Sequence, residues 1–435
     1  MRNVPISEAL RFWLKLGFIS FGGPAGQIAI MHQELVERRR WISEGRFLHA
    51  LNYCMLLPGP EAQQLATYIG WLLHRTRGGL VAGLFFILPS FFILVALSWL
   101  YVSFGKVPAV AAFFFGMKPA VVAIVAFAAW RVGSRVLRNA VLAAIAVLAF
   151  VALTLFSVPF PLIVVAAALA GVAGARLAPR FFQTVDHAPP VSGEVAALIE
   201  DHTAPPPHAI FSWGRLAWVL AAGLVLWLVA MAALVGFEGG HGTLSRMATF
   251  FTKVALVTFG GAYAVLPYVN QAAVEQFGWL TAPQMIDGLA LGETTPGPLI
   301  MVVTFVGYVG AWTQPSAQAL APWLAGIAGA TVVTFFTFLP SFVFIFAGGP
   351  LVEATRGRRA FTAPLAAITA AVVGVIANLA VYFARHVFWP TVPNAPDVLS
   401  LAIAAGAALA LFWFRLGVIP VILACGVAGL IVRLL

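Results

Sequence analysis

The chain has little charge and almost no cysteine. Asp, Glu, Lys and Arg make up 9% of its 435 residues, whereas 62% are hydrophobic, and only two residues are cysteines. Soluble domains carry about 25% charged residues, so this composition argues against a soluble globular protein. Cys54 and Cys425 each lie inside an apolar run, so the sequence supports neither a disulfide framework nor a cysteine metal site.

The sequence also lacks a signal-peptide pattern and an acidic balance. Arg11 and Lys15 interrupt the first apolar stretch, so we expect no cleavable signal and a first segment that belongs to the mature protein. The formal net charge is +10, but the arginines stand in short clusters between apolar runs. The positive-inside rule produces this pattern in membrane proteins, so we expect a lipid bilayer around the chain and no nucleic-acid partner.

One long apolar stretch is broken at its middle. The residues from Phe47 to Trp71 are apolar enough to enter a membrane, yet Pro58-Gly59-Pro60 interrupts them. The break predicts two half-helices of about 11 residues, each about 16 Å long, and neither can cross a hydrocarbon core of about 30 Å. In transporters such breaks mark the substrate site, whereas the plainer alternative is an ordinary span with a proline kink.

Read in order, the chain divides into four parts. The first has an initial helix that breaks at Phe21-Gly22-Gly23-Pro24, a charged turn, the broken stretch and four apolar runs. A polar, proline-rich linker follows, and we expect its histidines, His187, His202 and His208, to be solvated. The boundaries that we expect are 1-178 for the first unit, 179-213 for a cytoplasmic linker, 214-236 for an extra transmembrane helix and 237-435 for the second unit.

The second unit repeats the first. Phe21-Gly22-Gly23 recurs as Phe259-Gly260-Gly261, and Pro58-Gly59-Pro60 recurs as Pro296-Gly297-Pro298, both at the same offset along the chain. Leu88-Pro89-Ser90-Phe91 recurs as Leu339-Pro340-Ser341-Phe342 at a slightly larger offset, which places an insertion in the intervening turn. A register held over this distance indicates an internal duplication.

Charge predicts that the two copies have opposite orientations. The turns around the first broken stretch hold Arg38, Arg39, Arg40, Arg46, Arg75 and Arg77, whereas the equivalent turns of the second copy, 274–285 and 311–321, hold no Lys or Arg. The next turn reverses the bias, with Lys106 alone in the first copy and Arg356, Arg358 and Arg359 in the second. We therefore expect an all-α polytopic membrane protein made of two inverted-topology repeats, each with a re-entrant helical hairpin.

The breaks carry the groups that an oxyanion site needs. Free backbone N–H groups at half-helix N-termini can hold a dianion, glycines allow close approach, and neutral hydroxyls and amides can donate to it. The alternative for the same glycines and prolines is tight helix packing. The candidate substrate-binding residues are Ser20, Phe21, Gly22, Gly23, Pro58, Gly59, Pro60, Gln63, Thr258, Phe259, Gly260, Gly261, Thr294, Thr295, Pro296, Gly297 and Pro298.

Four ionisable residues lie near the breaks. Lys15 and Lys253 each stand five residues before a Ser/Thr-Phe-Gly-Gly break, where they either bind the anion or extend to the membrane interface. Glu61 and Glu293 are the acids nearest the two Pro-Gly-Pro breaks. A protonatable carboxylate there could couple proton movement to anion movement, although Glu61 could also cap its half-helix. Coupling to a counter-anion is the alternative to coupling to the proton gradient.

These motifs together resemble one family. Phe-Gly-Gly-Pro near the start, a charged turn that ends in Trp41, and Leu-Pro-Gly-Pro-Glu-Ala followed by Gln-Leu-Ala-Thr-Tyr-Ile-Gly look like the chromate ion transporter family in its long, two-domain form. The resemblance implies an inner-membrane secondary transporter that exports chromate, with no organic cofactor and no enzymatic activity. The second copy departs from the pattern at Ala262 and Leu299, so the two copies are chemically unequal.

Other functions stay open at this point. Sulfate is a tetrahedral dianion like chromate, and backbone amides do not distinguish the two. A passive anion channel or a membrane scaffold could share the duplicated architecture, but a passive pore has no need of a protonatable group at its bend. No cluster of metal ligands or nucleophiles stands out in the sequence, and the oligomeric state, including a homodimer, is left open.

Overall fold

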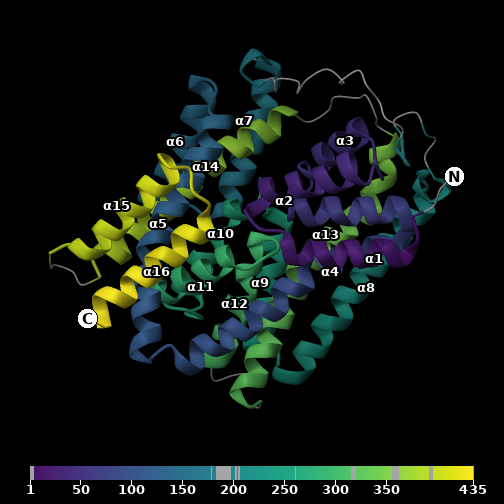
Figure 1. Ribbon diagram of the computed structural model, residues 1–435. Coiled ribbons are helices and arrows are strands. Elements are labelled where there is room, and N and C mark those ends of the chain that lie inside the picture. Colours follow the sequence, from purple (N-terminus) through teal and green to yellow (C-terminus); the bar gives the residue numbers. More distant parts are fainter. Residues whose placement is uncertain are drawn as a thin grey trace.

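A computed structural model describes residues 4–177, 179–182, 197–200, 203, 206–259, 261–314, 320–354, 362–390 and 395–434. Within these ranges the chain forms helices joined by short connections (Figure 1), and the β pairing is a single bridge between Ile42 and Ile199. Arg356, Arg358, Arg359, Gly260, His187 and His202, which figure in the sequence predictions, lie outside the described residues.

The first copy begins with a helix that breaks where the sequence predicts. Helix α1 ends at Ile19, and the next helix begins after Gly22, whose φ of +88° is a left-handed conformation that favours glycine. A second interruption, from Met55 to Pro60, contains Pro58-Gly59-Pro60. The elements of this copy are α1 (Ile6–Ile19), α2 (Gly23–His32), the π-helix η1 (Gln33–Arg38), α3 (Glu44–Cys54), α4 (Glu61–Phe104), α5 (Pro108–Val136), α6 (Ala140–Phe156) and α7 (Phe160–Leu177).

Helix α4 consists of two arms. His74 and Arg75 leave the helical conformation, and a Cβ on Gly70 would lie 2.5 Å from the carbonyl oxygen of Gly78. The chain therefore folds back on itself at this turn, and the first arm, from Glu61 to Leu73, is a half-helix. Because α3 has 11 residues, the prediction of two short half-helices around Pro58-Gly59-Pro60 is confirmed.

The second copy repeats this order of elements. Its π-helix begins at Gln271, the equivalent of Gln33, and its interruptions fall at the predicted positions. The equivalent of the bent α4 is a pair of separate helices, which meet closely at Gly307 and Gly329. The elements are α9 (Thr243–Val257), α10 (Ala262–Asn270), η4 (Gln271–Gln276), α11 (Ala282–Thr294), η5 (Leu299–Met301), α12 (Val302–Thr313), α13 (Pro322–Ala354), α14 (Thr362–Phe388), α15 (Val398–Phe412) and α16 (Val418–Leu434).

The helices of the two copies interleave. Helix α5 of the first copy contacts α14, α15 and α16 of the second, and α14 in turn contacts α5, α6 and α7. Small residues allow this close packing, because a Cβ on Gly116 of α5 would lie 2.8 Å from Gly429 of α16. Figure 1 shows the resulting group of helices on the left, with the broken helices α2, α9, α10, α11 and α12 toward the middle.

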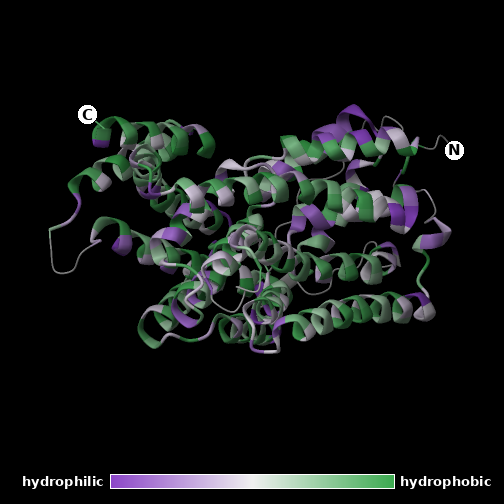
Figure 2. Cartoon of the chain, turned by 90° about the horizontal axis from the view of Figure 1, so that it is seen from below, coloured by the Kyte–Doolittle hydropathy of each residue, from purple (hydrophilic) through white to green (hydrophobic). Residues whose placement is uncertain are grey.

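The described helices belong in a membrane. Six of them are long and apolar enough to cross a bilayer, among them α8 (Trp213–Glu238), which follows the linker. Most of the ribbon is hydrophobic, and several hydrophilic segments lie near the N-terminus (Figure 2). The outward face of α8 is also apolar, with Trp218 74% exposed and Val229 63% exposed. These observations identify a multi-pass membrane protein.

The linker differs from its prediction at one residue. The sequence predicts that His208 is solvated, but the structure packs its ring edge-on against Trp71, with Nε2 2.9 Å from the Trp71 carbonyl oxygen. Burial lowers the pKa of His208, and the positive charges of Arg75 and Arg215 act in the same direction, although the bond to Trp71 opposes them. His208 therefore fixes the end of the linker to the first arm of α4.

Candidate functional site

The four predicted breaks meet between the two copies. The Gly59 N–H group donates a hydrogen bond to the Thr258 carbonyl oxygen, and the Gly297 N–H group donates to the Ser20 carbonyl oxygen, each with an N···O distance of 2.7 Å. Gly59 and Gly297 are equivalent positions, as are Ser20 and Thr258. A residue pair that recurs with the copies exchanged is the signature of a two-fold contact, so the Pro-Gly-Pro tip of each copy docks on the break of the other.

The Leu-Pro-Ser-Phe motif positions these tips. A Cβ on Gly59 would overlap the Ser341 hydroxyl oxygen, and a Cβ on Gly297 would lie 2.8 Å from the Cβ of Ser90. Both glycines have positive φ angles, +133° and +102°. Neither tip therefore has room for a larger residue, and the serine of each copy packs against the tip of the other.

A small cavity lies where the breaks meet. Its volume is about 10 Å³, enough for about one water molecule. Its wall comes from the starts of four helical segments, α2, α4, α10 and η5, whose first N–H groups have no partner within their own helix. The lining residues are Pro24, Gln27, Pro60, Glu61, Ala62, Gly261, Ala262, Pro298 and Leu299.

Several buried polar groups near the tips have no hydrogen-bond partner among the described residues. The hydroxyl oxygens of Ser20, Ser90 and Ser341 are in this state, as is Oε1 of Gln63 and of Gln64. A buried polar atom without a partner is costly, so these five atoms around one junction are candidates to bind a water molecule or a ligand. The sequence reading includes Ser20 and Gln63 but not the two motif serines.

Gln27 is a further site residue that the sequence reading missed. Its Nε2 lies 2.5 Å from the Gly297 carbonyl oxygen and 3.4 Å from that of Ser20, so it joins the tip of one copy to the break of its own copy. Its side chain is buried and lines the cavity. The equivalent residue of the second copy is Val265, so only the repeat alignment, read for differences, could have singled it out.

Other predicted donors are occupied in this conformation. The hydroxyl groups of Thr258, Thr294 and Thr295 donate to carbonyl oxygens one turn earlier in their own helices. Gln63 donates through Nε2 to Thr67 Oγ1 at 2.9 Å. The N–H groups of Gly59 and Gly297 are used in the contact between the copies. In this state these groups hold the junction together and do not face a common open space.

The two predicted acids have different surroundings. Glu61 is the first residue of α4 and lines the cavity, where the second copy has Leu299. Glu293 lies near the end of α11, is absent from the lining, and accepts a hydrogen bond from the Tyr263 hydroxyl. The structure therefore places Glu61 beside the junction of the four breaks, whereas a tyrosine engages Glu293.

The two predicted lysines lie on exposed surfaces. Lys15 on α1 and Lys253 on α9 are exposed, and neither lines the cavity. Each stands about one and a half turns before the break of its own copy. Ser20 and Thr258 are both buried, but Phe21 is exposed and Gly23 half-buried, whereas Phe259 is half-buried and Gly261 buried, so the first break is the more open of the two.

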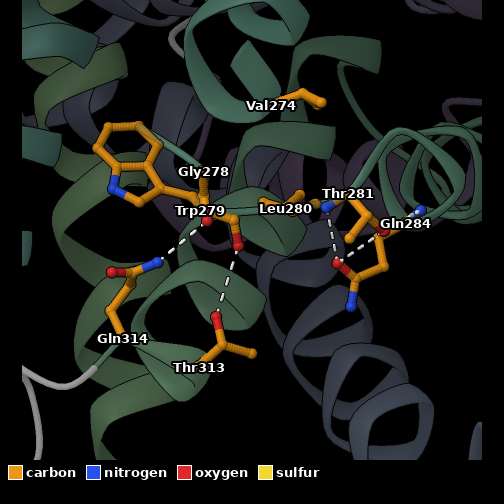
Figure 3. Close-up of a pocket in the computed structure, with 8 residues that line it drawn as sticks. All are labelled: Val274, Gly278, Trp279, Leu280, Thr281, Gln284, Thr313 and Gln314. Atoms are coloured by element: carbon orange, nitrogen blue, oxygen red, sulfur yellow. Dashed lines mark hydrogen bonds between the residues drawn. The ribbon is translucent and has the colours of Figure 1, made fainter. Parts of the chain in front are cut away.

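A larger hollow lies elsewhere and differs in character. Its volume is about 540 Å³, and Figure 3 shows Gln314 and Thr313 reaching the carbonyl groups of Gly278 and Trp279 at its wall. In the first copy the equivalent strip, Arg40–Ser43, is instead paired with Leu198 and Ile199 of the linker. The hollow is thus the place that the linker fills on the other copy, and none of its lining residues is charged.

The arginine-rich turn of the first copy is more structured than the sequence suggests. Arg38 and Arg39 bond to Glu34 at 2.9 Å and 3.3 Å. Burial alone would raise the pKa of Glu34, but these hydrogen bonds outweigh it and lower the pKa. Arg46, which the sequence reading treats as a turn charge, is 2% exposed and forms a 2.6 Å ion pair with Glu353.

Comparison with known proteins agrees with this duplicated architecture. The sequence profile described as chromate transporter matches residues 7–172 and again residues 245–430. The chain is 34% identical to the chromate transport protein of Pseudomonas aeruginosa over 97% of this chain and 91% of that protein. It is 28% identical to the chromate transport protein of Cupriavidus metallidurans over 88% of this chain and 83% of that protein.

A third relative extends the comparison to another group of bacteria. The chain is 27% identical to the probable chromate transport protein of Synechococcus elongatus over 94% of this chain and 96% of that protein. No solved structure shows significant similarity to the chain. Because the profile matches both copies and the Pseudomonas aeruginosa relative is matched over almost its whole length, the chain belongs to the chromate transporter family.

Proposed function

We propose that this chain is a secondary transporter that carries chromate out of the cell across the inner membrane, and that the small cavity is the closed form of its substrate site. The observation that carries the proposal is the reciprocal junction at which the tip of each copy docks on the break of the other. Family membership supports chromate as the substrate. The relatives bear the names of transport proteins, which supports transport over an enzymatic reaction.

The proposed topology follows from the two-fold junction and from charge. The axis lies in the membrane plane, so the copies are inverted, and each Pro-Gly-Pro segment is the tip of a re-entrant hairpin. Helix α8 supplies the extra crossing that inverts the second copy. The units are those expected from the sequence, 1-178, 179-213, 214-236 and 237-435, with the linker in the cytoplasm beside the arginine-rich turns.

We expect chromate to be bound by two sets of hydrogen-bond donors. One set has no partner in the closed structure, and the other set loses its present partners when the two copies separate. The helix starts that line the cavity supply N–H groups that have no partner within their own helix and the positive ends of helix dipoles. The hydroxyls of Ser20, Ser90 and Ser341 can donate to anion oxygens. A cavity of about 10 Å³ cannot hold a tetrahedral dianion. Opening must therefore separate the copies, and this frees the N–H groups of Gly59 and Gly297 for the substrate.

The same junction favours a transporter over a passive channel. Two backbone hydrogen bonds and two glycine–serine contacts close the centre of the protein. An anion can cross the junction only after these contacts break, and alternating access requires such a step. Glu61 supports proton coupling, because an ionised carboxylate at the cavity repels a dianion and a protonated one does not. Sulfate is the second candidate substrate, since hydroxyl and amide donors also fit its tetrahedral oxygens.

Transport into everted membrane vesicles tests the function. We expect vesicles with this protein to take up chromate when energised, to lose uptake when the proton gradient is collapsed, and to show weak competition by sulfate. Vesicles that carry Gly297→Leu, with equal protein content, are the control for passive leakage. Uptake that ignores the gradient would indicate a channel, and stronger transport of sulfate than of chromate would change the substrate.

Labelling of two equivalent positions tests the topology. Glu37 and Glu275 are both exposed and occupy matching places in the two π-helices. Cysteines at these positions, in a variant that lacks Cys54 and Cys425, should react with an impermeant thiol reagent from opposite faces of the membrane. Reaction of both from one face would end the inverted-repeat proposal.

A further inference from the structure

Two buried polar clusters join the copies on either side of the tips. In the first, Arg46 of α3 pairs with Glu353 of α13 at 2.6 Å, and the Tyr68 hydroxyl also donates to Glu353. In the second, Lys118 of α5 lies 3.5 Å from Asp287 of α11, and the Tyr101 hydroxyl donates to Asp287 at 2.9 Å. Each cluster ties the half-helix before one tip to the far end of the long helix of the other copy.

The two clusters occupy equivalent places but use different residues. Asp287 is the second-copy equivalent of His49, and His49 contacts the carbonyl group of Val352, which is the second-copy equivalent of Tyr101. Gln284 is the second-copy equivalent of Arg46. The fold thus provides one connection between the copies on each side of the cavity, and the chain gives each of them its own acid and base.

In the first cluster the carboxylate is fully paired, whereas Arg46 Nε has no partner among the described residues. Both carboxylate oxygens of Glu353 have partners, and both side chains of the ion pair are 1% exposed. Arg46 also donates to the carbonyl oxygens of Glu200 and Thr203 in the linker. Because the pair is buried and both Glu353 oxygens are occupied, no carboxylate oxygen is vacant for a proton from the solution. Breaking the pair would leave two buried charges without compensation.

The second cluster is incomplete. Asp287 is 3% exposed, yet its Oδ1 has no partner, and the ion pair to Lys118 is long at 3.5 Å. The Lys118 side chain is 27% exposed, so this pair is less enclosed than the Arg46–Glu353 pair. Lys118 and Tyr101 both contact Oδ2, and Lys118 is the one positive charge that forms an ion pair with this carboxylate among the described residues. At 3.5 Å this pair offsets little of the cost of burying the charge, and the vacant Oδ1 can accept a proton.

We propose that the Lys118–Asp287 pair is a proton-operated gate: a proton taken up by Asp287 breaks the ion pair and opens the cavity on the side away from the arginine-rich turn. This inference rests on the proposed transport function and deepens it by naming a coupling residue. The proton comes from hydronium in water that enters beside Lys118. It leaves water behind and forms the O–H bond of a neutral Asp287 carboxyl. Lys118 keeps its charge and, freed from Asp287, becomes available to an anion.

The surroundings of Asp287 leave few other groups that could titrate in its place. Helix α11 is packed against α4, α5, α12, α14, α16 and η5, and η5 holds no titratable residue. Among the described residues of these helices, Lys118 and Tyr101 are the titratable groups that act on Asp287. Protonation of Asp287 removes the Lys118 attraction and spares the neutral Tyr101 contact, so the charge across the interface between the copies is what changes.

Accessibility of the cavity tests the gate without any transport assay. Ala262 lines the cavity and is 4% exposed, so Ala262→Cys, in a variant that lacks Cys54 and Cys425, reports whether the cavity is open. We expect an impermeant thiol reagent, added on the gate side, to label this cysteine about ten-fold faster in mildly acidic than in mildly alkaline buffer. Rates are referred to the intrinsic reactivity of the thiol, measured on unfolded protein over the same pH range.

Three variants separate the gate from a structural role. Asp287→Asn should label fast at every pH, and Lys118→Gln should do the same, because an unpaired buried Asp287 takes up a proton. Tyr101→Phe keeps the charges and should retain the pH dependence.

A wild-type pH profile in Asp287→Asn overturns the proposal. If labelling follows these expectations while chromate uptake fails, the gate stands and the assignment of the substrate falls. Ala62→Cys provides a second reporter position if Ala262→Cys reduces the yield.

Discussion

The two copies share a backbone plan but differ in the side chains that carry charge. At the junction the first copy has Glu61 and Gln27 where the second has Leu299 and Val265. The contacts that shape the junction instead recur in both copies, through Gly59 and Gly297 and through their serine neighbours. The backbone contacts at the junction, which form the frame of the protein, therefore follow two-fold symmetry. The charged and polar side chains of Glu61 and Gln27 on this frame are present in one copy only.

One-sided chemistry on a symmetric frame suits a directional transporter. A symmetric frame lets the same movement expose the site to either face of the membrane. If both sides also carried the same charges, both gates would respond alike to pH and to substrate. Both carboxylate oxygens of Glu353 have partners, whereas Asp287 Oδ1 has none among the described residues. This difference makes the two sides of the junction unequal. Substitutions that remove the symmetric part should therefore have larger effects than those that remove the asymmetric part.

The largest effect is expected at the symmetric tips. Gly59→Leu and Gly297→Leu should each abolish chromate transport, because both positions have positive φ angles and no room for a Cβ. Gly406→Leu is the matched control, since a Cβ there would meet nothing within 4 Å. Vesicle uptake, normalised to the amount of folded protein, measures the effect. Retained activity in either tip variant would show that close backbone approach is not needed.

The next largest effect is expected at the Arg46–Glu353 pair. Arg46→Gln, which installs the residue that the second copy has at this position, should destabilise the protein by about 3–5 kcal/mol, because Glu353 then keeps a buried charge without its partner. Arg46→Gln combined with Glu353→Gln should recover part of this loss. Lys118→Gln should cost less, since Lys118 is partly exposed. Thermal unfolding of the purified variants in detergent ranks the three, and equal losses would contradict the difference between the clusters.

Sequence reasoning predicted the frame far better than the chemistry. Prolines and glycines act locally, so the breaks, the half-helices and the duplication followed from residue types and from a constant spacing. The partner of Arg46 is 307 residues away, and nothing in the neighbourhood of either residue indicates the other. The same holds for Gln27 and Gly297, which are 270 residues apart. Only the three-dimensional structure could pair these residues, and Arg46 therefore looked like a turn charge.

A smaller effect is expected at the two acids near the tips. Glu61→Gln should reduce the pH dependence of chromate transport to the part that the Asp287 gate sets, because Glu61 lines the cavity and an ionised carboxylate there repels a dianion. With this sign, wild-type transport increases as the pH falls, and the variant shows a smaller increase, which Asp287 sets. Glu293→Gln should change the profile less, because Glu293 is held by Tyr263 and does not line the cavity. Uptake measured over a pH series, with both sides of the membrane at the same pH, compares the two.

The alternative for Glu61 predicts a different outcome. If Glu61 only stabilises the start of α4 through the helix dipole, Glu61→Gln should lower stability by about 0.3–1 kcal/mol and leave the pH profile unchanged. Glu61→Asp keeps a titratable group at the same place and is the matched control. An unchanged profile in Glu61→Gln would leave Asp287 as the coupling acid to be tested.

The smallest effect is expected at the exposed lysines, and it tests whether the two entrances are alike. Five residues of helix correspond to about 7.5 Å, and at this distance a unit charge in water attracts a dianion by about 1 kcal/mol. Lys15→Gln and Lys253→Gln should therefore each raise the apparent KM for chromate by at most about five-fold and leave kcat unchanged.

Because the first break is the more open, its Lys15 should matter when chromate approaches from that side, and Lys253 when it approaches from the other. Uptake by vesicles of both orientations separates the two cases. Higher salt should shrink each effect, and Lys→Arg should preserve wild-type behaviour. An effect that is independent of salt would mean that the lysine acts through packing or membrane anchoring.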